Sequence, residues 1–355
     1  MYYVGSDLHK EQTWFYVMDE QGNKILSKSI PNNPKFLHKF FKSLPYPFTL
    51  AVEATYNWYF FIDIAEQYAE KVYLANSYEL KAFAKQHKKT DKIDARLIAD
   101  ILRKGFLPAV FIPSPEIRSL KELLRYRINL VRDRSRNIFR LKNMLDKIGI
   151  DSTGDYTTEK GLKSISFNCI EERYQYVVKG YIERLLFLTH KIYQMKIDLK
   201  NELFQDGDIQ NLISIDGVDY FSAGVIKSEI ADVNRFLSFN RLCAYAGLAP
   251  KVSQSGNKAA HHGALLANRR KLLQWILLEI VFHFIKASPE RKSRYDYLKE
   301  RKGSNTAKII MARQMLKIIY HILKEKRPYY DNIQLGREAN NIKFQSAAAV
   351  ALQGV

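Results

Sequence analysis

Short apolar runs separated by turn residues fill the first hundred positions of the chain. Three of them, at residues 2–7, 13–18 and 24–30, predict a meander of three strands. Helix-period and buried-strand patterns then alternate, at residues 34–41, 49–53, 57–69, 71–74 and 90–103. The order βββαβαβα predicts an α/β domain over residues 1–110, and its end is marked by three prolines, Pro108, Pro113 and Pro115.

A heptad repeat begins at Ile117 and predicts a long helix within a helical region at residues 111–205. Apolar residues recur every seven positions, at Ile117, Leu124, Val131, Ile138 and Leu145. A second row, three positions further along, includes two arginines: Leu120, Arg127, Arg134, Leu141 and Ile148. The spacing is typical of a coiled coil or a helical hairpin with two polar layers. It leaves two partners open, the segment at 176–199 and a second copy of the chain.

The third region, residues 206–327, is predicted to be a mostly α-helical domain, followed by a tail at 328–355. Helix patterns cover residues 213–230, 238–246, 265–286 and 307–323, and a loop containing Gly and Ser spans 247–263. The longest apolar run, residues 272–285, is too short to cross a bilayer and is interrupted by Glu279 and His283, so a buried helix is predicted. The last ten residues are expected to be poorly ordered.

The net charge of the chain indicates the class of molecule that it binds. The 355 residues carry a formal net charge of +19 and are 46% hydrophobic, which indicates a folded protein with a basic surface and a polyanionic partner, without membrane association. The first ten residues lack an apolar stretch of signal-peptide length, so a cytoplasmic location is expected. Cys169 and Cys243 are isolated, which argues against a zinc site or a disulfide framework.

Four acids stand at the ends of predicted elements. Asp7 and Glu53 end two strands that are neighbours in a fold of this order, and Asp91 and Asp94 share one face of the helix that begins after Thr90. Four converging carboxylates repel one another unless cations lie between them, and hard oxygen ligands favour Mg²⁺ or Mn²⁺. A simpler interpretation of the last two acids is that they complement the helix dipole.

The basic residues of interest lie in three segments, at residues 88–89, 125–140 and 251–270. Residues 116–147 contain ten Lys or Arg and four acids, so the outer face of the predicted helix is a basic stripe. Such a stripe is either a solvated face or a phosphate-binding surface. The candidate nucleic-acid contacts are Lys88, Lys89, Arg125, Arg127, Arg132, Arg134, Arg136, Arg140, Lys251, Lys258, Arg269 and Arg270.

A glycine-containing turn at residues 215–223 is similar to that of a helix-hairpin-helix motif. Such a turn offers backbone N–H groups to a phosphate at a helix N-terminus. Asp219 stands where a second glycine is usual, which favours an ordinary helical turn equally.

The segments at 4–10, 52–55 and 89–95 resemble the three acidic motifs of the IS110-type (DEDD) transposases and the related Piv-type invertases. The resemblance implies an RNase H-like, RuvC-like domain in which Asp7, Glu53, Asp91 and Asp94 bind the metal. Ser6 replaces an aliphatic residue of the family pattern, and Tyr56 stands where glycine is common. Neither departure removes a ligand.

Residues 236–256 are similar to a second motif block of these transposases, in which a serine is the nucleophile. By position that serine is Ser255, directly before Gly256, with Ser253 as the second candidate. A serine alcohol is a weak nucleophile, and a metal held by the acids activates it.

The resemblance spans residues 4 to about 323 and implies an insertion-sequence transposase that cuts and rejoins DNA through a serine–DNA intermediate. It also implies a structured guide RNA and a dimer or tetramer, because synapsis must hold two duplexes. Two other hypotheses remain open. One is a Holliday-junction resolvase that uses water with the same acids, and the other is a non-catalytic nucleic-acid-binding protein.

Overall fold

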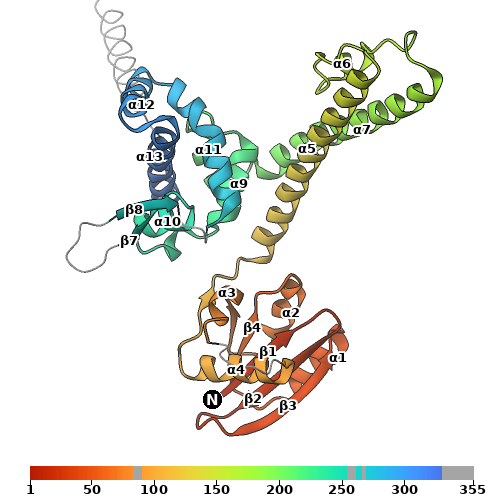
Figure 1. Cartoon of the computed structure of the whole chain (residues 1–355). Coiled ribbons are helices and arrows are strands. Elements are labelled where there is room, and N and C mark those ends of the chain that lie inside the picture. The colour runs from red at the N-terminus through yellow and green to blue at the C-terminus, as the bar shows by residue number, and fades with distance from the viewer. Residues whose placement is uncertain (84–89, 254–260, 266–268, 330–355) are drawn as a thin grey trace, which may run out of the picture. The chain divides into compact units, whose positions relative to one another are not determined.

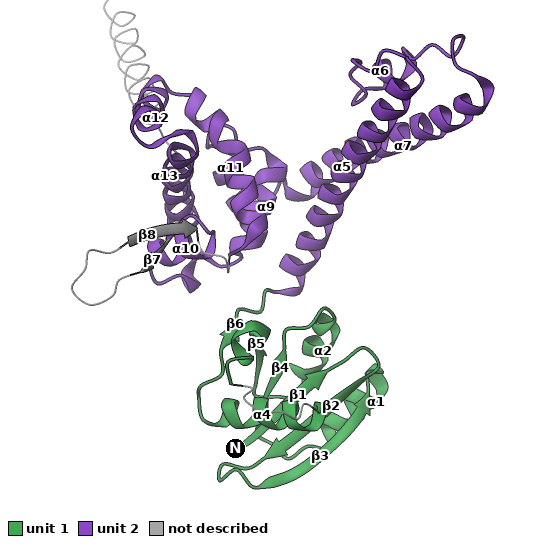
Figure 2. Ribbon diagram, in the orientation of Figure 1, with its two compact units in different colours: residues 1–113 green, residues 114–355 purple. Residues whose placement is uncertain are grey.

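The structure is a computed structural model that describes residues 1–83, 90–253, 261–265 and 269–329 (Figure 1). The chain divides into two compact units, Met1–Pro113 and Ser114–Val355 (Figure 2). In residues 251–253 and 261–265 the description is limited to the backbone. The last ten residues, which were predicted to be poorly ordered, lie outside the described residues.

A mixed sheet forms the first unit. Its described strands are β1 (Tyr2–Leu8), β2 (Gln12–Met18), β3 (Lys24–Pro31), β4 (Phe48–Glu53), β5 (Lys71–Ala75) and β6 (Ala109–Val110). They lie in the order β3-β2-β1-β4-β5-β6, with β1, β4 and β5 parallel and the other neighbours antiparallel. The predicted α/β order is confirmed. The two-residue β6 was not predicted, because it is too short to show an alternating pattern.

Helices cover both faces of this sheet. They are α1 (Pro34–Lys42), α2 (Trp58–Ala65), α3 (Ser77–Leu80) and α4 (Asp91–Arg103). Val4, Leu50 and Val52 pack in one core with residues of α1 and α2. Ala51 packs on the opposite face with Ile98 of α4. Successive side chains of a strand point to opposite faces, so the odd-numbered positions of β1 and β4 face α4.

Gly5 allows α4 to lie directly against β1. A Cβ atom at Gly5 would be 2.1 Å from the carbonyl oxygen of Ala95 and 2.4 Å from the amide nitrogen of Ala99, both on α4. These are backbone atoms, which do not move aside as the end of a side chain does. Any larger residue at position 5 therefore separates the helix from the strand.

A helical hairpin opens the second unit. Its arms are α5 (Pro115–Lys147) and α7 (Glu172–Leu203), joined through α6 (Glu159–Lys163) (Figure 1). Leu145 packs near Val178, whereas Leu124, earlier in α5, packs near Leu203 at the end of α7. The end of α5 thus packs near the start of α7, and an earlier part of α5 packs near the end of α7, so the two arms are antiparallel. The heptad positions thus find a partner within the chain.

The two polar layers of the hairpin are half-buried. Arg127 places its guanidinium 3.9 Å from the centre of the Phe221 ring, and burial lowers its pKa. Within the described residues, the Nε atoms of Arg127 and Arg134 are buried and have no hydrogen-bond partner. These arginines therefore contribute to packing.

Helices make up most of the rest of the second unit. The described elements are α8 (Gly207–Ile213), α9 (Tyr220–Ile230), η1 (Val233–Arg235), α10 (Phe239–Tyr245), β7 (Pro250–Ser253), β8 (His261–Leu265), α11 (Lys271–Lys286), α12 (Pro289–Lys302) and α13 (Ser304–Glu325). Their core also contains Leu124 and Leu203 of the hairpin. The loop expected at 247–263 is wrong in part, because β7 and β8 pair there as an antiparallel ladder.

Helix α11 contains the apolar run at 272–285 and is buried in this core, as predicted. Within the described residues, no single helix is long and apolar enough to cross a membrane. Helices α11 and α12 taken together have the length and composition of a membrane span, but the pair is bent by 117°.

The turn between α8 and α9 contains Gly217, whose φ of +85° suits glycine. Asp219 caps α9, because its carboxylate accepts a hydrogen bond of 2.8 Å from the amide of Ser222. A phosphate at this helix end would meet a carboxylate and one amide that is already bonded. The local geometry is that of an ordinary capped turn.

Gly5→Ala is expected to destabilise the first unit by about 2–3 kcal/mol, because the added methyl group overlaps the α4 backbone. Urea denaturation followed by circular dichroism measures the change. Gly180→Ala is the control: position 180 lies within α7 with open space around it, so alanine is expected to stabilise the protein by about 0.5–1 kcal/mol. Equal stability of Gly5→Ala and the unchanged protein would show that α4 tolerates displacement.

Candidate active site

Asp7 and Glu53 lie beside each other at the carboxyl ends of parallel strands. Ser6 pairs with Val52 in the ladder between β1 and β4, so Asp7 and Glu53 follow at the next position of each strand. Both have odd numbers and therefore face the α4 side of the sheet. Ser6 faces the other way and is fully buried, so the unusual serine in this motif lies away from the acids.

Asp91 and Asp94 lie in the first turn of α4. The hydroxyl of Thr90 caps this helix by accepting a hydrogen bond of 3.4 Å from the amide of Ile93. Because α4 rests on Gly5, its first turn reaches the end of β1, where Asp7 lies. Both Asp91 and Asp94 raise the pKa of Asp7 by charge repulsion, so three of the four predicted acids interact.

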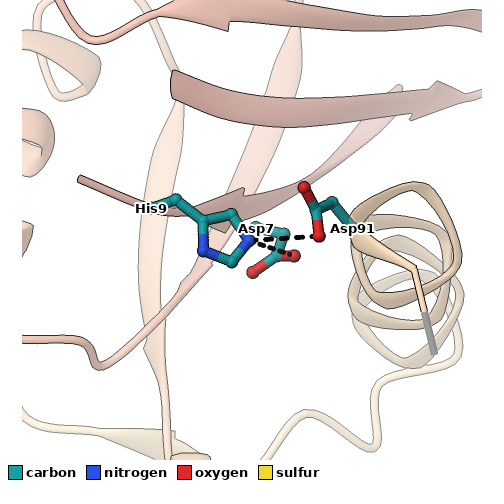
Figure 3. Close-up of side chains that lie close together, drawn as sticks. All are labelled: Asp7, His9 and Asp91. Carbon is teal, nitrogen blue, oxygen red and sulfur yellow. Dashed lines mark hydrogen bonds and ion pairs between the residues drawn. The ribbon is translucent and has the colours of Figure 1, made fainter. Parts of the chain in front are cut away.

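His9 joins two of the acids. Its Nε2 atom lies 3.1 Å from Oδ2 of Asp7 and 3.3 Å from Oδ1 of Asp91 (Figure 3). The imidazole therefore bridges β1 and α4. Prediction of the site from the sequence omitted His9, although its position two residues after Asp7 in the first motif was the available signal.

Burial raises the pKa of the Asp7 carboxyl to about 6. The neighbouring His9 opposes this shift by its charge and its hydrogen bond, and Asp94 and Asp91 add to it. Only 8% of the Asp7 side chain is exposed, compared with 45% for Asp91. Asp7 is thus a buried carboxyl among other acids, an arrangement that costs stability unless a cation is present.

The donor atoms at this site fit a divalent cation. Asp7, His9 and Asp91 each offer one ligand atom, and these atoms lie within 4.8 Å of one another. Carboxylate oxygens suit Mg²⁺ and Mn²⁺, and an imidazole nitrogen suits the transition metal better. Glu53 follows Val52 at the end of β4 and Asp94 lies in the first turn of α4, and neither belongs to this group of three ligand atoms among the described residues.

Several predicted residues have no described side chain. Ser255, Lys258, Lys88 and Lys89 lie outside the described residues. Ser253 and Lys251 lie in β7, where the description covers the backbone only. The relation of either serine to the acids therefore stays a prediction.

Predicted arginines occupy different environments on α5 and near α11. Arg125 lies 3.1 Å from Glu122 and 3.6 Å from Glu229. Arg136 pairs with Asp133 on the same helix at 2.6 Å. Arg132 and Arg140 are exposed.

The two arginines before α11 are hydrogen-bonded to α11 itself and to α10. Arg269 donates to Oε1 of Gln274 at 2.7 Å, and Arg270 donates to the Tyr245 hydroxyl at 3.0 Å. Charge alone therefore does not separate arginines that pack from arginines that are available to a ligand.

Two protein-family models match the chain. One, described as a transposase and of the DEDD type of IS110, matches residues 4–150. The other, described as the transposase IS116/IS110/IS902 family, matches residues 209–296. The first includes all four acids, and the second includes both candidate serines.

Curated relatives are similar over most of their length. The transposase for insertion sequence element IS1328 of Yersinia enterocolitica is 25% identical over 268 residues, 73% of this chain and 77% of the relative. The transposase for insertion sequence element IS1111A of Coxiella burnetii is 25% identical and covers 72% of each chain. The pilin gene-inverting protein of Moraxella bovis is 24% identical and covers 79% of this chain and 81% of its own.

Asp7→Asn is expected to stabilise the metal-free protein at pH 8. The pKa of Asp7 rises from 3.8 in the unfolded chain to about 6 in the folded one, so ionised Asp7 costs ~3 kcal/mol of stability above pH 6. The folded state binds the proton more tightly, so this cost shrinks as the pH falls from 6 and disappears below 4. Urea denaturation in EDTA, from pH 8 to pH 4, measures the gain.

Asp100→Asn serves as the control on α4. Burial raises the pKa of Asp100, but hydrogen bonds from Lys104 and Arg103 outweigh this and lower it. Removing that carboxylate is therefore expected to destabilise the protein at pH 8, with the effect shrinking in acid. A gain for Asp7→Asn that is independent of pH would contradict the assignment of a raised pKa.

Proposed function

The chain belongs to the IS110 family of transposases, and we propose that it cuts and rejoins DNA at a metal-binding site of four acids, with a serine as the nucleophile. The observation that carries this proposal is the meeting of Asp7 and Asp91 at His9, where β1 ends and α4 begins. A buried acid with a raised pKa beside two further acids is typical of a cation site. The family supplies the class of substrate, DNA.

The first unit is proposed to be an RNase H-like, RuvC-like domain. The support is the strand order β3-β2-β1-β4-β5, with β1 in the middle and antiparallel to β2. In this arrangement, acids at the ends of β1 and β4 face the first turn of α4. The contact of Asp7 and Asp91 with His9, and the place of Glu53 directly after Val52 in β4, support this proposal.

Asp7, Asp91, Glu53 and Asp94 are the proposed ligands of Mg²⁺ or Mn²⁺, with His9 adjacent. When bound, such an ion supplies positive charge to a phosphate and lowers the pKa of a coordinated hydroxyl. The chain's own contribution is to hold the acids in place through the rigid contact at Gly5. Asp7 must be ionised to serve as a ligand, which its pKa of about 6 permits at neutral pH.

Ser255 is the proposed nucleophile, with Ser253 as the alternative. The serine oxygen attacks phosphorus of a DNA strand, its bond to phosphorus forms, and the bond to one strand oxygen breaks. A strand hydroxyl later attacks the phosphoserine and releases the serine. One phosphate ester replaces another at each step, so rejoining needs no external energy source.

The proposed partners are donor and target DNA, a structured RNA and further copies of this chain. The basic arm α5 supports contact with nucleic acid backbone, and recognition of RNA by shape and phosphate suits such a surface. An oligomer follows from the need to hold two duplexes in synapsis. A resolvase that uses water differs from this proposal at the serine, and a non-catalytic binding protein differs at strand cleavage.

A covalent protein–DNA adduct is the expected product in the presence of Mg²⁺, the DNA that flanks the gene and RNA transcribed from it. The adduct is read on a denaturing gel. Ser255→Ala and Asp94→Asn are each expected to abolish it, whereas Ser253→Ala is expected to retain it. Strand cleavage by Ser255→Ala without any adduct would favour a resolvase instead, and DNA binding without any cleavage would favour a non-catalytic role.

Metal binding tests the acid site independently of DNA. Asp7→Asn and Asp91→Asn are each expected to weaken Mn²⁺ binding by about tenfold or more in isothermal titration, and His9→Gln by about tenfold. Asp100→Asn, on the same helix but paired with Lys104, is the matched control and is expected to bind normally. Equal affinity in all four variants would place the metal elsewhere.

A further inference from the structure

A cavity of about 420 Å³ lies where α5 meets the start of α11 in the second unit. Arg125, Asn129 and Arg132 line it from one face of α5, and Lys271 and Trp275 line it from the first turns of α11. Both helices belong to the same compact unit. Its volume is within the range of small-molecule sites in proteins.

The floor of the cavity is apolar and one wall is aromatic. Ile128 and Leu272 line it with aliphatic side chains, and Trp275 keeps 39% of its surface exposed. An indole that is open to solvent beside an aliphatic floor offers a stacking surface for a planar ring. The Asn129 side-chain amide, also exposed, supplies both a donor and an acceptor.

The charges at this cavity favour an anion. Arg132 and Lys271 are exposed, and the side chain of neither forms an ion pair or hydrogen bond with any described residue. Arg125 shares its charge with Glu122 and Glu229. The lining has three cations and, within the described part of the chain, no acid.

Further cations lie near Arg125 of the cavity lining. Burial lowers the pKa of Lys121 to about 8; Glu229 opposes this, and Arg270, Arg125 and Arg235 add to it. Among the groups that act on Lys121, one carboxylate thus faces three arginines. A polyanion at the cavity would relieve this excess of positive charge.

We propose that this cavity binds one unpaired nucleotide of a single-stranded nucleic acid, with its base stacked on Trp275 and its phosphates on Arg132, Arg125 and Lys271. Stacking on an aromatic ring needs a base that is free of its partner, so single strands are preferred over duplex. The same chemistry suits RNA and DNA. The inference rests on the proposed function for its class of ligand, nucleic acid, and adds the place and the mode of binding.

A second cavity, which Trp275 also lines, offers a contrast. It is lined by Asp219, Glu279 and His283 among others and has a volume of about 450 Å³. Two carboxylates there repel phosphate. The cations of the lining therefore assign the nucleotide to the cavity between α5 and α11.

The fluorescence of Trp275 reports binding at the cavity once the other two tryptophans are replaced. Full-length protein with Trp14→Phe and Trp58→Phe retains Trp275 as its sole tryptophan. A ten-nucleotide RNA, a DNA of the same sequence and its duplex are titrated, and indole fluorescence is recorded. Both single strands are expected to quench it, and the duplex to leave it nearly unchanged; the two single-strand arms show whether RNA or DNA binds better.

Substitutions in the cavity lining test whether these residues determine the affinity for nucleic acid. The affinity is measured by fluorescence anisotropy of labelled oligonucleotides. Trp275→Leu is expected to weaken single-strand binding by about 5- to 100-fold and Trp275→Tyr, which keeps a ring, by much less. Arg132→Gln is expected to lower affinity and to reduce the salt dependence by about one phosphate contact. Arg136→Gln removes the same charge from α5 outside the cavity and is expected to have a smaller effect.

Anisotropy separates failure of this inference from failure of the proposed function. Oligonucleotide binding without quenching of Trp275, or equal affinity of Trp275→Leu and the unchanged protein, overturns the nucleotide site and leaves the transposase function standing. Equal losses in Arg132→Gln and Arg136→Gln overturn it too, because they indicate general charge attraction. Absence of binding to any of the three oligonucleotides contradicts both proposals. Thermal melts verify that each variant is folded.

Discussion

The direct contact between α4 and β1 at Gly5 is the constraint on which the candidate site depends. With backbone atoms of Ala95 and Ala99 next to Gly5, the helix lies as close to the strand as the absence of a side chain allows. Its first turn therefore holds Asp91 close to Asp7, with His9 between them. A glycine without any chemistry of its own thus sets the distance between acids that are more than eighty positions apart in the chain.

This arrangement holds the acids of the site together and lowers the stability of the folded protein. Asp7 is buried among other acids, and its pKa is raised because burial and the neighbouring carboxylates disfavour its charge. Proteins commonly accept such local costs where a ligand must bind. The surrounding layers of α1 and α2 on the other face of the sheet, with their large apolar core, supply the stability that the acids reduce.

In the second unit, packing determines what each arginine does. Arg127 lies against the Phe221 ring and Arg270 is bonded to Tyr245, so both contribute to the contact between helices. Arg132, on the same arm as Arg127, faces a cavity instead. One face of this basic helix therefore lies in the core, whereas the other lines a cavity.

The order of the main strands and helices of the first unit was predictable from the sequence, because alternation and helix period are local. Acids at element ends also stand out in the sequence, and the metal-binding role of the four acids stays a prediction. The partner of the heptad helix, the role of His9, the cap at Asp219 and the separation of packing arginines from exposed ones were not predictable from the sequence. Each depends on which residues meet across long distances in the chain, and only the folded structure determines those contacts. A period of seven describes the face that a helix buries, but not the surface against which it is buried.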